Sequence, residues 1–421
     1  MTKPIILSEQ WEWKTADVPK LPVDFDSYSK QIDGKDSFCV KVKLSDKELL
    51  FSTSYFIGAD WIYINNSPDF PIYVKSKLND ENQEIDCLNM LFEAMSESEN
   101  FNYLDGLCEI DFDAPQINIT QQQDILSPFL IIQFLQILKR IVQKGLKKTY
   151  YPVEQNLNAK VKGKILVNKT IKKNILQNQF TKTFCKYDEF GYNGDENKIL
   201  KKAFLFSQSA LQQHIAKQQS IEGIIGYIRP AFENVTDDIQ IDKIKVFKPN
   251  PMYKEYGQAL KLALLILKRY SFNITETIKT EIPTPPFWID MSKLFELYVF
   301  KKLREIFPKR NEVMFQFEAK GRFLDFLINN SDVKMVVDAK YKPRYKDSSI
   351  NIDDMRQICG YARMEKVYNE LHKPINELID CLVIYSHQSC SNTFSKADLT
   401  KTSENSYVNF YKLGIKLPEI Q

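Results

Sequence analysis

The sequence predicts a protein of mixed α/β class that is built from three parts. Because helices and strands are concentrated in different parts, the chain as a whole is α+β. Apolar residues recur at helical spacing through the middle of the chain, whereas β-branched runs bounded by turn residues dominate its C-terminal part. The length of 421 residues and the hydrophobic content of 43% suit two or three domains with a sizeable core. We therefore expect a small mixed domain over residues 1–115, a mainly helical connector over 116–280 and an α/β domain over 287–421.

Charge is divided unevenly along the chain. Residues 1–113 carry 10 basic and 22 acidic side chains, a net charge of −12, and the remaining 308 residues carry 47 basic and 32 acidic side chains, a net charge of +15. An acidic domain is repelled by a phosphate backbone and suits a protein partner, whereas a basic region can lie on nucleic acid. We expect the two regions to face different partners.

The connector is expected to contain three helices, over residues 127–144, 197–219 and 258–270. The apolar stretch 126–142 is interrupted by two glutamines, a lysine and an arginine, which predicts a core helix and not a membrane span. Eight lysines and no acidic residue stand between Glu154 and Asp188, where they either form a solvated strand face or contact DNA. A proline-rich hinge is expected at 281–286, before the last domain.

The most informative segment is a pair of expected strands, 322–328 and 334–340, joined by a turn of Asn, Ser and Asp residues. Strand residues two apart lie on one face of a sheet, so Asp338 and Lys340 point the same way. A neighbouring strand can bring Asp325 beside Asp338. The alternative is an ordinary hairpin with solvated ends, but Asp338 follows an apolar run in which an unpaired acid is costly to bury.

Two carboxylates and one ammonium group that converge on one point form a site for a hard divalent cation. Mg²⁺ prefers oxygen ligands and keeps several waters, so Asp325, Asp338, the backbone carbonyl of Ala339 and a phosphate oxygen suffice to hold it. The Lys340 ammonium can orient or help deprotonate the attacking water, and it can stabilise charge on the scissile phosphate. The pattern therefore indicates a metal-dependent nuclease.

Two flanking segments are expected to add to this site. Residues 287–303 have the pattern of an amphipathic helix, whose Glu296 either reaches the metal site or is an ordinary solvated helix residue. Residues 353–361 have the signals of a helix start, and Gln357 and Tyr361 lie four apart on one face of it. This pair is similar to the Q-x-x-x-Y element of RecB-like nucleases.

A basic stretch follows the second strand. Lys342, Arg344 and Lys346 are interleaved with Tyr341 and Tyr345. We expect the three basic residues, together with Tyr361, to contact DNA, since lysine and arginine neutralise phosphates. A solvated surface is the alternative.

The order Glu296, Asp325, Asp338-x-Lys340 and Gln357 is more specific than any of its members. Further signatures occupy residues 146–154, 161–167, 187–190, 196–203 and 250–253. With them the chain resembles the McrC family, the nuclease subunits of McrBC restriction systems, which are built on the PD-(D/E)xK fold. The resemblance runs from about residue 50 to the C-terminus. Leu324 stands where the motif's name has proline, a residue that is commonly missing in this superfamily.

The resemblance implies a Mg²⁺-dependent DNA endonuclease subunit, with Mn²⁺ as a possible substitute, in an anti-phage restriction system. Its partners would be double-stranded DNA and an AAA+ GTPase or other NTPase of McrB type, whose hydrolysis it stimulates and which the acidic domain would contact. The chain has no G-x-x-x-x-G-K-[S/T] loop, so no nucleotide is expected to bind to it. Two alternatives are a stand-alone RecB-like repair nuclease and an inactive scaffolding subunit, although the intact Asp325, Asp338 and Lys340 argue against the latter.

Cysteine and histidine usage limits the remaining possibilities. Seven cysteines without a C-x-x-C pair, in a chain without a secretion leader, predict free thiols and a cytoplasmic location away from membranes. The three histidines have no companions at ligand or triad spacing, which argues against zinc and imidazole catalysis.

Overall fold

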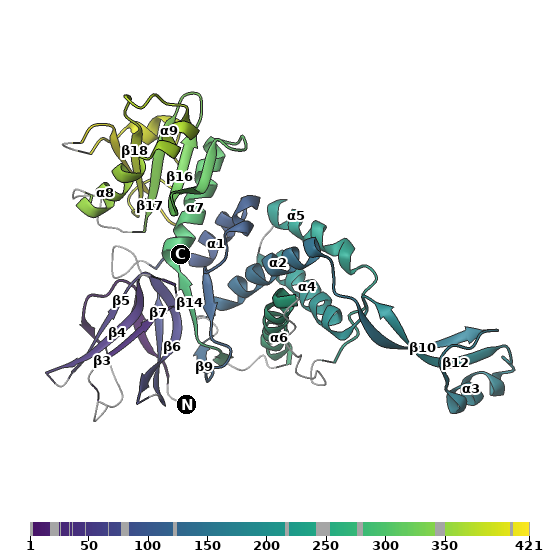
Figure 1. Ribbon diagram of the computed structural model, residues 1–421. Coiled ribbons are helices and arrows are strands. Elements are labelled where there is room, and N and C mark those ends of the chain that lie inside the picture. The colour runs from purple at the N-terminus through teal and green to yellow at the C-terminus, as the bar shows by residue number, and fades with distance from the viewer. Residues whose placement is uncertain are drawn as a thin grey trace. The chain divides into compact units, whose positions relative to one another are not determined.

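The structure is a computed structural model that describes residues 3–16, 25, 27–32, 34–35, 37–46, 48–65, 67–76, 84–120, 124–214, 219–240, 253–275, 281–341, 350–404 and 407–420. The chain divides into two compact units (Figure 1). Unit 1 consists of Met1–Phe129 and Ile278–Gln421, and unit 2 consists of Leu130–Thr277. The candidate catalytic residues all belong to unit 1.

The N-terminal part of unit 1 contains two sheets. The five-stranded sheet has the order β1-β7-β6-β14-β8, with β1 Ile5–Ser8, β7 Ser67–Lys75, β6 Phe56–Ile64, β14 Phe287–Asp290 and β8 Cys108–Ile110. The four-stranded sheet has the order β2-β5-β4-β3, with β2 Lys14–Thr15, β5 Glu48–Thr53, β4 Phe38–Ser45 and β3 Ser27–Gln31. Val40, Phe51 and Ile72 are buried in a core shared by these strands, and Trp288 of β14 joins them.

Strand β14 corrects the sequence prediction for residues 287–303. The helix α7 spans Met291–Ile306 and begins after Asp290, whose side chain accepts a hydrogen bond from the Lys293 backbone N–H at 3.0 Å. The apolar residues before it pair instead with β6 and β8. Gly58 permits this pairing, because a Cβ there would lie 2.0 Å from the Phe287 carbonyl oxygen.

The expected hinge at 281–286 is also wrong, because β13 Glu281–Thr284 forms a two-stranded sheet with β9 Ile117–Thr120. Pro283 is compatible with this small sheet, where a missing backbone donor is tolerated at an edge. Helix α1 Cys87–Met95 and the 3₁₀ helix η1 Ser98–Asn102 complete this part. The early helix agrees with the expected mixed character of the N-terminal region.

The C-terminal part of unit 1 is a five-stranded sheet of order β15-β16-β17-β18-β19. Its strands are β15 Val313–Ala319, β16 Arg322–Asn329, β17 Lys334–Lys340, β18 Asp380–Ser386 and β19 Phe410–Ile415. The first three are antiparallel and the last three parallel. Helices α8 Ile352–Tyr361 and α9 Glu365–Leu371 share a buried core with the sheet, and the 3₁₀ helix η8 Lys396–Thr400 precedes β19.

The alternating apolar pattern also predicts a strand over 313–317, before the two expected at 322–328 and 334–340. All three are confirmed to within two residues, because local chemistry defines their ends. Lys320 and Gly321 both have positive φ, at 51° and 74°, as a two-residue hairpin with the right twist requires. In the second turn, the Asn330 side chain accepts a hydrogen bond from the Asp332 backbone N–H at 3.0 Å. Phe315 and Phe326 stack on Phe300 of α7, which fixes that helix against the sheet.

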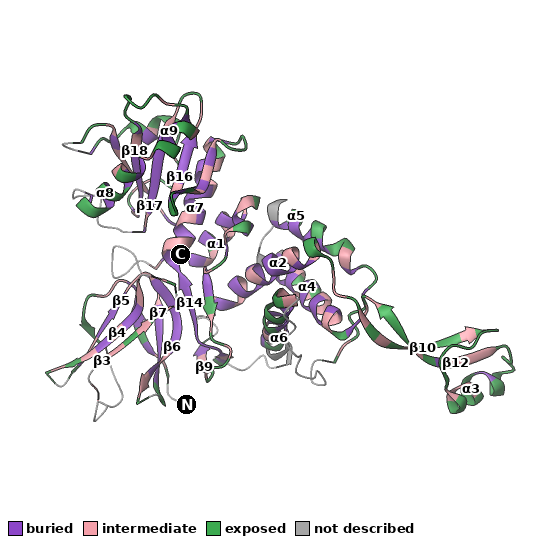
Figure 2. Ribbon diagram, viewed as in Figure 1, coloured by how far each residue is buried: buried purple, intermediate pink, exposed green. Residues whose placement is uncertain are grey.

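Unit 2 contains the expected helices and also a three-stranded sheet, in the region where the lysines were expected either to form a solvated strand face or to contact DNA. The helices are α2 Leu126–Lys144, which starts in unit 1, α3 Val167–Lys173, α4 Asp195–His214, α5 Gln219–Ile228 and α6 Lys254–Thr275, with 3₁₀ helices η3 Ile175–Gln177 and η4 Arg229–Phe232. The three strands are β10 Thr149–Asn158, β12 Lys182–Gly191 and β11 Lys164–Ile165. This ribbon and α3 are largely exposed (Figure 2). The apolar Leu176 and Phe180, in the segment between α3 and β12, are 73% and 72% exposed. Helix α2 is long and apolar enough for a membrane span, but 61% of it is buried, as in a core helix.

Candidate active site

The two aspartates predicted to converge are brought together by strands β16 and β17. The ladder between these strands is recorded as far as Phe326 opposite Val337, and Asp325 and Asp338 occupy the next positions. The Asp325 carboxylate accepts a hydrogen bond from the Ala339 backbone N–H at 2.8 Å. At the position where the backbone pairing of β16 and β17 ends, the Asp325 side chain thus accepts a hydrogen bond from the backbone of β17.

On its other side, Asp325 faces an irregularity in β15. Among the described strand pairs, Phe315 pairs with Phe326 and Phe317 with Leu324, but Gln316 and Asp325 form no pair. Gln316 has a left-handed φ of 51°, a conformation that costs a residue with a side chain on the order of 1 kcal/mol. Such interruptions re-aim side chains near functional sites. The sequence gives no signal for the interruption at Gln316, because glutamine is not a turn-forming residue.

Lys340 lies at the centre of the polar contacts. Its Nζ is 2.8 Å from Oδ2 of Asp338, which is only 2% exposed, and donates to Oε1 of Gln357 at 3.3 Å. Nζ also lies 3.9 Å from Oδ1 of Asp354. The Gln357 side chain donates in turn to the Tyr361 hydroxyl at 3.2 Å. The structure therefore brings Gln357 to the predicted cluster.

Helix α8 supplies both of these contacts from a single turn. Its N-cap, Asn351, accepts a hydrogen bond from the Asp353 backbone N–H at 2.9 Å. Asp354 and Gln357 are three residues apart and so face the same side of the helix. The sequence prediction missed Asp354, although its spacing from Gln357 could have revealed it.

The site places the carboxylates of Asp325 and Asp338 close together and away from solvent. Burial, followed by the charges of Asp338 and Glu296, raises the pKa of Asp325 well above its usual value. Burial alone would lower the pKa of Lys340, but the charges of Asp338 and Asp325 outweigh it and hold that pKa above its usual value. Lys340 therefore remains an ammonium group and a hydrogen-bond donor.

Glu296 lies on α7 within electrostatic range of this cluster. Burial raises its pKa to about 7, helped by the charges of Asp290 and Asp338. Among the described residues, none forms a recorded hydrogen bond or ion pair with the Glu296 carboxylate. Its side chain is partly buried, which argues against the alternative of an ordinary solvated helix residue.

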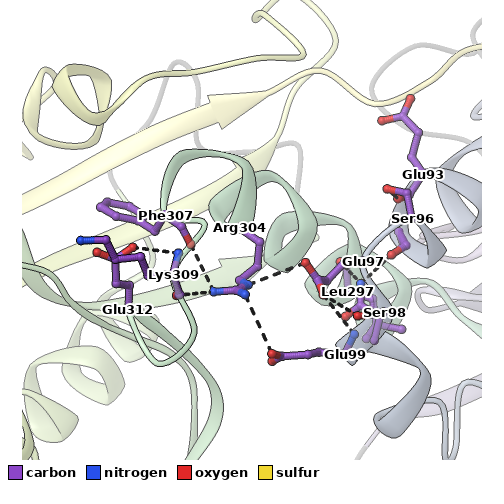
Figure 3. Close-up of polar contacts among 12 residues, drawn as sticks. Glu93, Ser96, Glu97, Ser98, Glu99, Leu297, Arg304, Phe307, Lys309 and Glu312 are labelled. Atoms are coloured by element: carbon purple, nitrogen blue, oxygen red, sulfur yellow. Dashed lines mark hydrogen bonds and ion pairs between the residues drawn. The ribbon is translucent and has the colours of Figure 1, made fainter. Parts of the chain in front are cut away.

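The helix that carries Glu296 is fixed at its far end by Arg304 (Figure 3). The Arg304 guanidinium donates to the backbone carbonyls of Phe307 and Lys309 at 3.2 and 2.6 Å. It also forms ion pairs with Glu97 and Glu99, at 3.7 and 3.9 Å. The two glutamates belong to the start of η1, so the guanidinium links α7 to the N-terminal part of unit 1.

The donor set can be compared with the needs of a metal ion. The described residues contain no group of three or more His, Cys, Asp or Glu side chains arranged to hold one. Mg²⁺ needs only one or two carboxylates, since it keeps several waters. Asp325 and Asp338 provide these, and a cation between them would relieve the repulsion that raises the pKa of Asp325.

The predicted DNA-contact residues have different outcomes. Lys342, Arg344 and Lys346 lie outside the described residues. Tyr361 is 8% exposed and its hydroxyl accepts a hydrogen bond from Gln357, so it helps to hold the Gln357 side chain. Ala339 is held through its backbone N–H, and the role predicted for its carbonyl stays a prediction.

Comparison with known proteins identifies the family. The family model described as McrBC 5-methylcytosine restriction system component matches residues 62–371, more than half of the chain. The chain belongs to this McrBC family. No curated protein matches it.

Two solved structures similar to this McrBC-family chain come from Thermococcus gammatolerans. One is a half-complex from a tetradecameric assembly of McrB AAA+ hexamers with bound McrC, at 16% identity and a TM-score of 0.34, covering 89% of this chain and 80% of that one. The other is a cryo-EM structure of the McrBC complex, at 16% identity and a TM-score of 0.28, covering 74% of this chain and 90% of that one.

Proposed function

We propose that this McrBC-family chain is the Mg²⁺-dependent DNA endonuclease subunit of a restriction system, acting in the cytoplasm and activated by an AAA+ NTPase partner of McrB type. The observation that carries the proposal is the convergence of Asp325, Asp338 and Lys340 at the end of β17, with Gln357 against the ammonium group. A five-stranded sheet that α7 precedes, with α8 and α9 between β17 and β18, is consistent with the PD-(D/E)xK fold.

The chemistry assigned to each side chain follows from its position. Asp325 and Asp338 would hold Mg²⁺, which when bound supplies charge neutralisation at the scissile phosphate and lowers the pKa of a water. Lys340 stays protonated, so it stabilises charge on the phosphate and orients the attacking water as a donor. Gln357 and Asp354 hold the ammonium group in place. Glu296 would act as an auxiliary group.

The partner follows from the family and from what the sequence lacks. The family model describes a component of a multi-protein restriction system, and the sequence contains no phosphate-binding loop of its own. The energy for translocation along DNA would therefore come from an NTPase subunit. The acidic N-terminal region remains our first candidate for docking on it, since it would be repelled by DNA.

A cleavage assay tests the catalytic assignment. Purified protein is mixed with the NTPase encoded beside it, nucleotide, Mg²⁺ and duplex DNA. Asp338→Ala and Lys340→Ala should lose cleavage while remaining folded and still binding the partner. Asp332→Ala and Lys334→Ala, at the opposite end of the same hairpin, are matched controls that should cleave normally. Cleavage at the wild-type rate by Asp338→Ala would refute the assignment.

The same assay separates the two alternatives. Efficient, nucleotide-independent degradation of duplex DNA by this chain alone would favour a stand-alone RecB-like repair nuclease. Full NTPase stimulation without cleavage, in Mg²⁺ or in Mn²⁺, would favour an inactive scaffolding subunit.

A further inference from the structure

Tyr341, which directly follows Lys340, is clamped by the N-terminal segment of the chain. Its phenol donates a hydrogen bond to Oε1 of Glu9 at 2.8 Å, and both residues are almost fully buried, at 3% and 2% exposure. Its carbonyl oxygen accepts a hydrogen bond from the Gln10 side chain at 3.4 Å. Its ring lies 5.9 Å from that of Phe295, the neighbour of Glu296 in the sequence.

The other end of this clamp is fixed by backbone hydrogen bonds. The Glu9 N–H donates to the Lys75 carbonyl of β7 at 3.0 Å, and the Gln10 N–H donates to the Ser54 carbonyl at 2.8 Å. Glu9 follows β1, which runs parallel to β7 within the five-stranded sheet. The five-stranded sheet therefore holds the backbone of Glu9 in place, and with it the carboxylate that contacts Tyr341.

We propose that Glu9 is a positioning residue of the nuclease site, which holds the end of β17 through Tyr341 and thereby sets the place of the Lys340 ammonium group. The proposal rests on the proposed function for its catalytic consequence. It makes the N-terminal segment part of the catalytic machinery in addition to a candidate docking region.

The consequence for catalysis follows from the geometry of Lys340. Its Nζ lies between Asp338 at 2.8 Å and Gln357 at 3.3 Å, so a small displacement of the backbone disturbs both contacts. A misplacement of about 1 Å can cost roughly 100-fold in rate. Removing the Glu9 carboxylate or the Tyr341 hydroxyl would leave the other group buried without this hydrogen bond, and the strand end would relax.

The test uses the full-length protein with its NTPase partner, well below the melting temperature. Glu9→Ala and Tyr341→Phe should each lower kcat for cleavage about tenfold at unchanged KM for DNA, because they act on positioning and not on binding. Glu9→Gln keeps an oxygen acceptor and should stay near wild type. The double variant should be no slower than either single variant, as expected for residues that act through one contact.

A second measurement does not depend on cleavage. In metal-free protein, backbone hydrogen exchange of residues 334–341 should be faster in Glu9→Ala and Tyr341→Phe than in wild type or Glu9→Gln. If the wild-type protein does not cleave DNA, the proposed function fails, and hydrogen exchange still decides whether Glu9 holds this strand end.

The matched control is Tyr298→Phe. Tyr298 is 1% exposed on α7, and burial followed by the charge of Glu93 raises the pKa of its phenol, so the substitution also removes a buried phenol beside a glutamate. It should lower stability without changing kcat or exchange in 334–341. The proposal is overturned if Glu9→Ala and Tyr341→Phe exchange as wild type there, or if Tyr298→Phe lowers kcat as much as they do.

Discussion

Individual charges in the candidate site are arranged at a cost to the folded protein. The pKa of Asp325 is raised by burial and by the charges of Asp338 and Glu296, so its ionised form is disfavoured in the folded state. A group whose pKa is higher in the folded than in the unfolded chain loses stability as pH rises through the folded value. At neutral pH without metal, Asp325 therefore opposes folding, because the folded state disfavours its charge.

Asp325→Asn should consequently make the metal-free protein more stable at pH 7, because the asparagine side chain carries no charge to bury, while abolishing cleavage. The asparagine oxygen can still accept the Ala339 N–H bond. Denaturant unfolding in EDTA measures the gain. Added Mg²⁺ should raise the melting temperature of wild type but not of the variant. A variant that is less stable than wild type in EDTA would contradict the electrostatic explanation.

Glu296 should impose a pH dependence on stability. Its pKa rises from 4.5 in the unfolded chain to about 7 in the folded protein, so the folded chain holds the proton more tightly between these values. Stability present at low pH is then lost as pH approaches 7. Glu296→Gln should flatten this slope, seen by unfolding metal-free protein at pH 5 and pH 8, and should reduce cleavage only partly. An unchanged slope would show that Glu296 does not titrate in this range.

At the scale of elements, the sequence predicted the helices and strands that local residues define, and it failed where the partners are distant in the sequence. The strands between 313 and 340 were predicted because alternation and turn residues define them locally. The segment 287–290 was assigned to the helix because its apolar residues suit either structure, and its strand partners at 56–59 and 108–110 are remote in sequence. The left-handed Gln316 and the contact of Asp354 with Lys340 depend on tertiary packing in the same way.

Helix α8 gives a prediction at this scale. Gln357→Ala removes the amide oxygen that accepts a hydrogen bond from Lys340 Nζ at 3.3 Å. Cleavage should fall by roughly 10- to 100-fold, the range of an orienting contact, with little change in stability because alanine favours a helix. Arg356→Ala, on an exposed face of the same helix, is the control. Equal effects of both substitutions would mean that α8 acts only as a scaffold.

At the scale of the whole molecule, the charge division along the sequence still requires a functional test. Deleting residues 1–115 is unsuitable, because it would remove β6 and β8, the two neighbours of β14. Asp46→Lys combined with Glu48→Lys reverses exposed charges in the β4–β5 turn without touching the core. We expect this pair to weaken NTPase stimulation and to spare DNA binding, since it alters only the acidic surface.

The comparison variant is Leu176→Ser with Phe180→Ser, on the exposed apolar surface of unit 2. It should leave NTPase stimulation intact. If it abolishes stimulation while the charge reversal does not, the docking surface lies in the lysine-rich middle region, 160–186.

In unit 1, backbone hydrogen bonds join a segment near residue 85 to one near residue 419, and this has a consequence for synthesis of the protein. Residues near Glu84 bond to residues near Ile420: the Asp86 N–H donates to the Pro418 carbonyl, and the Ile420 N–H donates to the Glu84 carbonyl. The ribosome therefore has to add all of unit 2 and the whole sheet β15–β19 before these contacts can form. Pairings this distant in sequence form slowly. A nascent chain that already contains Asp325, Asp338 and Lys340 still lacks β18 and β19, so the candidate site can mature only after these two strands have been added.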